Sequence, residues 1–390
     1  MDWVFINSVQ IVHMTREPSF TIGLEEEYLL VDHNSRDLIQ EIPPAVLSAC
    51  ENLLRGQVTP ELLQCQIEVG TRVAKTLGQA REDLTHLRKT VARVAREHDI
   101  ALIAASTHPF SAWGNKKRTE KERYEIFARD MQEVVRRLMI CGMHVHIGIE
   151  DDDLRIDLMN QVSYILPHLL VLSTSSPFWE GHDTGLASYR IAVWNEMPRT
   201  GFPERFASFG EYQRHVDILV NAGVIQDATM LWWDVRPSAR FPTLEMRICD
   251  MCTRIEDAIC IAALYMCWLH MLYRLRLGNQ RWRTYATLLL DENRWRAQRY
   301  GFEKGLMDFG KGDIVPYGEL LEEILFLIRE DAEYFDCVAE VEHARVIVER
   351  GTSAHWQVQT YQDVIAGGGS HNEAQKAIVD MLIKETLYGT

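Results

Sequence analysis

Alternating apolar and polar residues near the start of the chain predict a β-strand over residues 21–31 (TIGLEEEYLLV). Successive side chains of a strand point to opposite faces, so Glu25 and Glu27 share one face and Glu26 lies on the other. Two neighbouring carboxylates repel each other, and a divalent ion such as Mg²⁺ or Mn²⁺ relieves that repulsion. An exposed edge strand whose charges block aggregation accounts for the same stretch.

Two later strands are predicted to gather polar side chains on one face. Residues 64–71 place Glu68 on such a face, and residues 138–149 place His144 and His146 on another. A histidine pair of this kind binds a metal, transfers protons, holds a phosphate or simply belongs to the core. The glycines on either side of the pair favour a functional site, because they let a ligand approach the backbone closely.

Residues 229–250 are predicted to form two strands joined by a loop. The second strand places Glu245 and Arg247 on one face, a combination that is most often an ordinary ion pair. Arg236 and Arg240 precede them in the sequence. A planar guanidinium group suits phosphate, because it donates two hydrogen bonds at once.

Helices are predicted for most of the remaining chain. The apolar residues between 77 and 94 are three and four positions apart, which is typical of an amphipathic helix. Helices are also expected at 43–54, 119–137, 154–173 and 209–222 and over most of 254–390, with short strands at 32–41 and 101–105. Residues 175–203 are rich in Gly, Pro, Ser and aromatic side chains and are expected to form a long functional loop.

The composition is that of a globular protein and argues against some classes of partner. The chain has 390 residues, 47% of them hydrophobic, which is enough to bury a sizeable core. Its formal net charge of −15 argues against general nucleic-acid binding and against docking on an anionic membrane. No internal repeat is visible, so we expect a single domain over residues 15–390, preceded by a loosely attached leader over residues 1–14.

The cysteines and the apolar segments favour a cytoplasmic location. Eight cysteines are scattered along the chain rather than grouped into a disulfide framework, which suits a reducing compartment. The first 18 residues lack a basic segment followed by a long apolar one, so a signal peptide is not expected. The apolar run at 259–273 is too short to span a bilayer and is predicted to be a buried core helix.

The four polar strand faces together predict one site. If these strands share a sheet, their carboxylates and imidazoles form a patch beside a group of arginines. Carboxylates that hold Mg²⁺ and arginines that hold phosphate are what ATP chemistry requires. The sequence has no P-loop, no kinase catalytic loop and no Gly-x-Ser-x-Gly nucleophile motif.

Five motifs follow one another along the chain: Gly23–Tyr28 (GLEEEY), Gln66–Glu68 (QIE), Gly142–His146 (GMHVH), Trp232–Ser238 (WWDVRPS) and Pro242–Arg247 (PTLEMR). In this order they resemble the type 2 glutamate–cysteine ligase family, specifically its bacterial carboxylate–amine ligase branch. Shorter matches at 183–185, 188–190, 293–297 and 351–354 extend the likeness from about residue 18 to the C-terminus.

The resemblance implies an α+β, glutamine-synthetase-like fold, with a curved, mainly antiparallel sheet and helices packed outside. It implies an ATP-dependent C–N ligase that uses Mg²⁺ or Mn²⁺ and forms an amide through an acyl phosphate. The substrates would be a small carboxylate and an amine, with glutamate and cysteine, giving γ-glutamylcysteine, as first candidates. A homo-oligomer is common for this family.

The resemblance also assigns metal ligands. One metal ion is assigned to Glu25, His144 and Glu245. A second is assigned to Glu27 and Glu68, with a further ligand that the sequence does not identify. Glu68 is expected among the catalytic residues as well.

Phosphate binding is assigned to basic residues. Arg247 would be catalytic, since it would stabilise the γ-phosphoryl group electrostatically during transfer. The other residues expected to contact the ATP phosphates are His146, Arg236 and Arg240.

Arg190 and Tyr189, in the long loop, are assigned to substrate binding, and the loop itself is expected to act as a lid that keeps water from the acyl phosphate. The chain departs from the family nearby, because residues 172–177 read LSTSSP where an Ala-Asn-Ser-Pro pattern is often found. This departure leaves the ATP and metal assignments intact and concerns the identity of the substrates.

Two other classes of function stay open. A metal-dependent hydrolase also combines histidines and carboxylates around a metal that activates water, whereas the arginines and the third carboxylate strand favour a ligase. A catalytically silent nucleotide- or amino-acid-binding protein of the same fold is the second, and the intact set of polar residues argues against it.

The substitution Glu27→Gln is expected to abolish ADP formation and to leave the fold intact, because it removes a charge from a metal site rather than volume from the core. An assay of ADP release, with circular dichroism to check folding, measures both effects. Turnover like that of the wild type would count against the metal assignment.

Overall fold

A computed structural model describes residues 17–119, 129 and 131–390, and its centre is a seven-stranded sheet. The strand order is β10-β11-β5-β1-β3-β2, and β4 also pairs with β1. Every pair in this sheet is antiparallel. Its strands are β1 (Ile22–Asp32), β2 (Val58–Pro60), β3 (Gln66–Gly70), β4 (Ile100–Ile103), β5 (Met143–Gly148), β10 (Val235–Pro237) and β11 (Thr243–Met246).

The central strand β1 has one polar and one apolar face, as its alternating sequence predicts. Leu24, Glu26 and Tyr28 are fully buried on one face, here called the back face. Glu25 and Glu27 lie on the opposite, front face and are partly exposed. Since β1 pairs with β5, β3 and β4, the alternative of an exposed edge strand is wrong.

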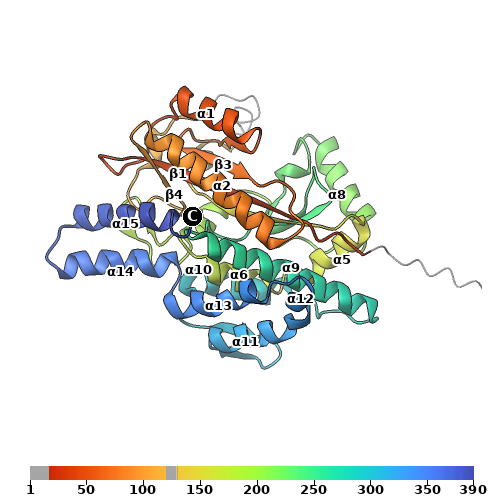
Figure 1. Ribbon diagram of the computed structural model, residues 1–390. Coiled ribbons are helices and arrows are strands. Elements are labelled where there is room, and N and C mark those ends of the chain that lie inside the picture. The colour runs from red at the N-terminus through yellow and green to blue at the C-terminus, as the bar shows by residue number, and fades with distance from the viewer. Residues whose placement is uncertain (1–16, 120–128, 130) are drawn as a thin grey trace, which may run out of the picture.

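Helices cover the back face and surround the sheet (Figure 1). Among those that contact its strands are α2 (Leu77–Arg96) and α9 (Ile255–Leu277). The other helices are α1 (Pro44–Leu54), α4 (Glu133–Arg136), α5 (Asp152–Val162), α6 (Leu166–Ser173), α7 (Tyr189–Trp194), α8 (Phe209–Asn221), α10 (Thr287–Tyr300), α11 (Tyr317–Leu327), α12 (Arg329–Tyr334), α13 (Val338–Arg350), α14 (Ser353–Ala366) and α15 (His371–Thr386).

Several helix ends follow from local sequence. Thr76 caps α2 by accepting a hydrogen bond from the backbone N–H of Gln79. Ser370 and Glu373 form a reciprocal capping box at the start of α15. The long helices α14 and α15 then lie side by side as a hairpin at the left of Figure 1.

Two predictions of local structure are corrected. The segment 32–41 forms no strand beyond a single bridge between Val31 and Leu38. The segment 175–203 is more ordered than the predicted loop. It contains α7, the pair β6 (Phe178–Trp179) and β7 (His182–Asp183), and β8 (Thr200–Gly201), which pairs with β9 (Trp232–Trp233). Phe178, Trp179, Ile191, Val193 and Met197 are buried. This removes the basis for expecting a lid there.

The other predicted elements are placed as follows. The helix predicted at 154–173 is divided into α5 and α6, and Pro167 stands near the start of α6. The C-terminal region is helical apart from the hairpin of β12 (Leu306–Asp308) and β13 (Asp313–Val315). The leader at 1–14 and most of the helix expected at 119–137 lie outside the described residues.

Helix α9 and the cysteines belong to the interior. Among the described residues, α9 is long and apolar enough to cross a membrane, but 89% of its most apolar 18-residue window is buried inside the fold. All eight cysteines are unpaired and buried. Burial raises the pKa of Cys50 to about 11 and those of Cys65 and Cys249 to about 12. The cytoplasmic location itself stays a prediction.

An ion pair with no exposure to solvent joins the back face of β1 to α2. Arg88 donates from Nε and Nη2 to the two carboxylate oxygens of Glu26, both at 2.7 Å, and both side chains are 0% exposed. Tyr28 donates its hydroxyl to the same carboxylate. The remaining donors of Arg88 reach the carbonyls of Cys252 and Thr253, just before α9, and of Thr386 at the end of α15.

Removing the cation of this pair is expected to destabilise the fold strongly. In Arg88→Met the Glu26 carboxylate stays buried without its partner, which costs about 3–5 kcal/mol of unfolding free energy. Urea denaturation measures this loss. In Glu26→Leu/Arg88→Met most of it should be recovered, because neither partner is then a buried charge.

Arg93→Met is the matched control, since Arg93 lies on the same helix in an exposed pair with Glu97. Its expected cost is below about 1 kcal/mol. Equal losses in Arg88→Met and Arg93→Met would contradict the role assigned to the buried pair.

Candidate active site

A cavity of about 510 Å³ lies over the front face of the sheet. Carboxylates, imidazoles and guanidinium groups from several strands line it together with apolar side chains. The ionisable residues that line it are Glu25, Glu27, Glu61, Glu68, His144, His146, Arg190, Arg236, Arg240, Glu245 and Arg247. All the charged residues that the sequence predicted for the site are therefore at the cavity.

The pairing register brings these side chains together in rows across the strands. Glu245 stands opposite Arg236 on one side and His146 on the other. Residue 25 of β1 stands opposite His144, and residue 27 stands opposite Glu68. Antiparallel neighbours on one face lie close enough for direct contact, so the register creates the clusters described next.

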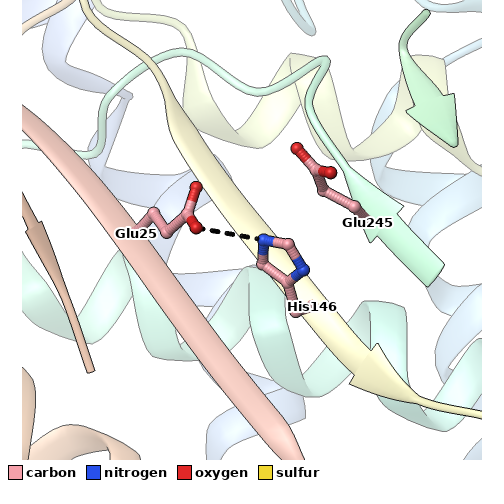
Figure 2. A group of neighbouring side chains, drawn as sticks. All are labelled: Glu25, His146 and Glu245. Atoms are coloured by element: carbon pink, nitrogen blue, oxygen red, sulfur yellow. Dashed lines mark ion pairs between the residues drawn. The ribbon is translucent and has the colours of Figure 1, made fainter. Parts of the chain in front are cut away.

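The first cluster joins three strands through Glu25, His146 and Glu245 (Figure 2). One ligand atom of each lies within 4.8 Å of the others. His146 Nε2 is 3.3 Å from Glu25 Oε1, and His144 Nδ1 donates to Glu25 Oε2 at 3.0 Å. The prediction grouped Glu25 and Glu245 with His144. In the structure it is His146 that lies within this group. His144 lies between Glu25 and Glu27 and contacts both carboxylates.

Charge compensation keeps this cluster ionised. Burial alone would raise the pKa of Glu25, but hydrogen bonds from His144 and His146 lower it well below its usual range. Burial, followed by the charge of Arg247, lowers the pKa of His144 to about 4. Burial opposes protonation of His146 too, yet Glu25 and Glu245 raise its pKa above the usual value.

The second cluster consists of Glu27, Glu61 and Glu68, whose ligand atoms also lie within 4.8 Å of one another. Glu61 is a candidate for the further ligand that the sequence did not identify. It directly follows β2, a strand of three residues that is too short to show an alternating pattern. Thr59 of β2 donates a hydrogen bond to Glu68 at 3.2 Å.

In the second cluster, burial and repulsion between carboxylates outweigh the nearby positive charges. Burial, followed by repulsion from Glu61, raises the pKa of Glu27 to about 8. Burial and the same neighbour raise the pKa of Glu68 well above its usual range. A divalent cation would remove both effects, and three carboxylates are oxygen ligands of the kind that Mg²⁺ and Mn²⁺ take. The donor sets of both clusters therefore fit such ions.

The arginines divide into two kinds. Arg236 is committed to protein partners, because it holds both carboxylate oxygens of Glu245 and the carbonyls of Thr229 and Leu231. Arg247 also donates to Glu245, but its buried Nε has no hydrogen-bond partner among the described residues. Arg247 thus keeps a donor for a ligand, whereas Arg236 mainly supports Glu245.

The two remaining cationic candidates differ in depth. Arg240 is exposed, at the cavity mouth between β10 and β11. Arg190 is only 3% exposed and lines the cavity from α7. Tyr189 does not reach the cavity, because its ring packs on Trp179 at 5.3 Å and its hydroxyl accepts from Arg137.

Trp194 is a lining residue that sequence reasoning missed. Its ring lies 5.8 Å from the guanidinium carbons of both Arg190 and Arg247, and its indole N–H donates to the carbonyl of Trp232. An aromatic face attracts cations, so Trp194 helps to hold the two arginines at one end of the cavity.

Comparison with known proteins identifies the family. Residues 21–379 match the family model described as glutamate–cysteine ligase family 2. The chain belongs to this family. A Rhodospirillum rubrum protein named "Putative glutamate--cysteine ligase 2" is 60% identical, over 95% of this chain and 97% of the relative. A protein of the same name from Chloroflexus aggregans is 41% identical over 95% of this chain and 93% of its own length.

The fold is shared with solved structures at low sequence identity. A glutamate–cysteine ligase from Francisella tularensis, solved in complex with AMP, gives a TM-score of 0.63 at 12% identity, over 94% of this chain and 92% of that one. A bifunctional glutathione synthetase from Pasteurella multocida gives 0.68 at 15% identity, over 94% of this chain and 52% of that one, so the chain spans about half of that protein.

The comparisons confirm three expectations. The resemblance stated from the sequence is confirmed, and so is the class of enzyme, an ATP-dependent C–N ligase. The glutamine-synthetase-like α+β fold is confirmed by the structural neighbours and by the antiparallel sheet with its outer helices. The roles of individual residues stay predictions.

In the absence of divalent cations, the protein is expected to lose stability as the pH rises toward 8. Burial raises the pKa of Glu27 from 4.5 to about 8, so the folded state holds a proton that the unfolded chain releases between these values. The unfolding free energy then falls with pH, by at most about 1.4 kcal/mol per unit from this group. Urea titrations between about pH 6.5 and 8 measure the slope.

Glu27→Gln should flatten this slope, and Mg²⁺ should stabilise the wild type more at pH 8 than at pH 6.5, because the ion competes with protons for the carboxylates. Glu97→Gln, at an exposed helix end, is the control and should leave the slope unchanged. Identical slopes in the wild type and Glu27→Gln would refute the assignment of the raised pKa.

Proposed function

We propose that this protein is a carboxylate–amine ligase that uses ATP to join a small carboxylate to an amine through an acyl phosphate. The observation that carries the proposal is that two acidic clusters suited to cations line one cavity with Arg247, whose Nε has no hydrogen-bond partner in the described part of the chain. A cavity that activates water at a single metal needs neither the second acidic cluster nor the arginines beside it.

The proposed reaction has two steps. A carboxylate oxygen of the first substrate attacks the γ-phosphorus of ATP, and ADP leaves. The amine nitrogen of the second substrate then attacks the carbonyl carbon of the acyl phosphate, inorganic phosphate leaves, and the nitrogen gives up a proton. Divalent cations bound at the two clusters would supply the charge that neutralises the phosphates.

The residues of the chain act by position and charge. Arg247 faces the transferred phosphoryl group with its free Nε, and its attachment to Glu245 fixes its direction. Arg190 holds the substrate carboxylate with its buried positive charge. Arg240, at the mouth of the cavity, meets the outer phosphates of the nucleotide.

Glutamate and cysteine are the first candidates for the substrates. The relatives and one structural neighbour carry the name of an enzyme that joins them. The cavity also has apolar walls at Leu62, Leu138 and Ile140, beside the second acidic cluster, which suit a substrate with a small apolar side chain.

The decisive measurement is ADP release with ATP and Mg²⁺ across an array of amino acids and small carboxylates offered in pairs. Release that requires both a carboxylate and an amine is the expected result, and the active pair names the substrates. Release with the acid alone would indicate acyl-phosphate formation with the true amine missing.

Release of phosphate that needs no acid would favour the hydrolase instead. ATP binding without turnover for any pair would favour the silent binding protein. Arg240→Gln is a useful companion variant, because it should raise the KM for ATP several-fold while the KM for the acid stays unchanged.

A further inference from the structure

A buried carboxylate outside the cavity is not used by the proposed reaction. Asp250 is 0% exposed and follows β11 by a few residues. It accepts hydrogen bonds from the backbone N–H of Ser175 at 2.9 Å and from the hydroxyls of Ser176 and Ser188, both at 2.7 Å. Burying an ionised carboxylate is costly, so three donors converging on one carboxylate mark a built arrangement.

Two of these bonds lead directly to the helix that carries Arg190. Ser188 is the residue before α7, so its bond to Asp250 fixes the start of that helix. The Ser176 hydroxyl donates to Asp250 and at the same time accepts the backbone N–H of Arg190 at 3.1 Å. A continuous chain of hydrogen bonds thus runs from the carboxylate to the backbone of Arg190.

The side chain of Arg190 is held by the segment just before Asp250. Its Nη1 and Nη2 donate to the carbonyls of Ile248 and Arg247, both at 3.1 Å. A Cβ at Gly142 would lie 2.3 Å from Arg190 Nη2, so only glycine leaves room for the guanidinium group there. Residues 247–250 therefore fix Arg190 at both its backbone and its side chain.

An uncharged side chain cannot replace Asp250 in this arrangement. All three of its partners donate, and a carboxylate accepts from all of them. Oδ2 accepts from Ser175 and Ser176 and Oδ1 accepts from Ser188, so an amide with a single accepting oxygen cannot keep all three bonds. Burial raises the pKa of Asp250, and the positive charge of Arg190 counteracts that rise.

We propose that Asp250 is a positioning residue for the carboxylate substrate: through Ser176 and Ser188 it sets α7 so that Arg190 faces the cavity. This rests on the proposed function, in which Arg190 binds the substrate carboxylate. Asp250 touches neither ATP nor substrate, so its removal should affect the acid and not the nucleotide. Within the serine-rich stretch 173–177, the hydroxyl of Ser176 and the backbone N–H of Ser175 serve this carboxylate.

The test compares Asp250→Asn and Ser176→Ala with Ser173→Ala. Ser176→Ala removes the link between the carboxylate and the backbone of Arg190, and Asp250→Asn loses at least one of the bonds that hold α7. Each should raise the KM for the acid about tenfold or more, with the KM for ATP within about twofold of the wild type. Ser173 is the matched control, because its buried hydroxyl bonds to the backbone N–H of Asp250 rather than to the carboxylate. Ser173→Ala should leave both KM values unchanged.

Hydrogen exchange of the peptide covering residues 188–194 supplies a readout that needs no turnover. Its amides should exchange about tenfold faster in Asp250→Asn and Ser176→Ala than in Ser173→Ala, while peptides from α2 stay unchanged. Unchanged exchange at 188–194, or KM values for the acid and ATP that rise together, would overturn the proposal.

The outcomes separate this inference from the proposed function. If the wild type turns over no pair of substrates, the proposed function fails, and hydrogen exchange still decides whether Asp250 holds α7. If the wild type is active and the acid KM of Asp250→Asn equals that of Ser173→Ala, only the inference fails. In Arg190→Ala/Asp250→Asn the effects on the acid KM should not add, because both changes remove the same contact; full additivity would overturn the proposal.

Discussion

The whole site depends on which way the side chains of β1 point. Glu25 and Glu27 serve the cavity only because Glu26, between them, is turned to the back face and paired with Arg88. A slip of one residue would exchange the two faces of the strand. The pair of Glu26 with Arg88, whose donors also reach α9 and α15, makes that slip very costly, so packing on the back face sets the geometry on the front face.

The front face combines strong opposite charges in a small space. Glu245 accepts from Arg236 and Arg247, and Glu25 accepts from a histidine, so the first cluster is compensated by the protein itself. The second cluster has no comparable cation within its group of three carboxylates and carries raised pKa values instead. The two neighbouring clusters therefore differ in how much they gain from a bound cation, and the second gains more.

Much of this architecture could be predicted because strand alternation is local. The strands β1, β3, β5 and β11 and the stripe of α2 were visible in the order of the residues. Features that depend on register were not. His144 and His146 share a face, and only the pairing of β5 with β11 decides that His146 meets Glu245. Arg236 was expected at phosphate, but the pairing of β10 with β11 places it opposite Glu245.

The segment 175–203 was mispredicted for a related reason. Its serines, glycines and prolines are typical of an exposed loop. The hydroxyls of Ser176 and Ser188 are nevertheless buried, because they donate to the Asp250 carboxylate, which is distant in sequence. Glu61 escaped notice because it follows a strand of three residues, which shows no period. Both features depend on contacts with residues that are distant in the sequence, Asp250 for the serines and Glu27 for Glu61.

The burial of the eight cysteines has a practical consequence for assays that measure thiols in solution. Only the thiolate form of a cysteine reacts readily, and burial both hides these sulfur atoms and disfavours that form. While the protein is folded, these buried thiols should therefore react slowly with disulfides in solution. Reagents that count free thiols in a mixture should react mainly with small-molecule thiols rather than with the folded protein.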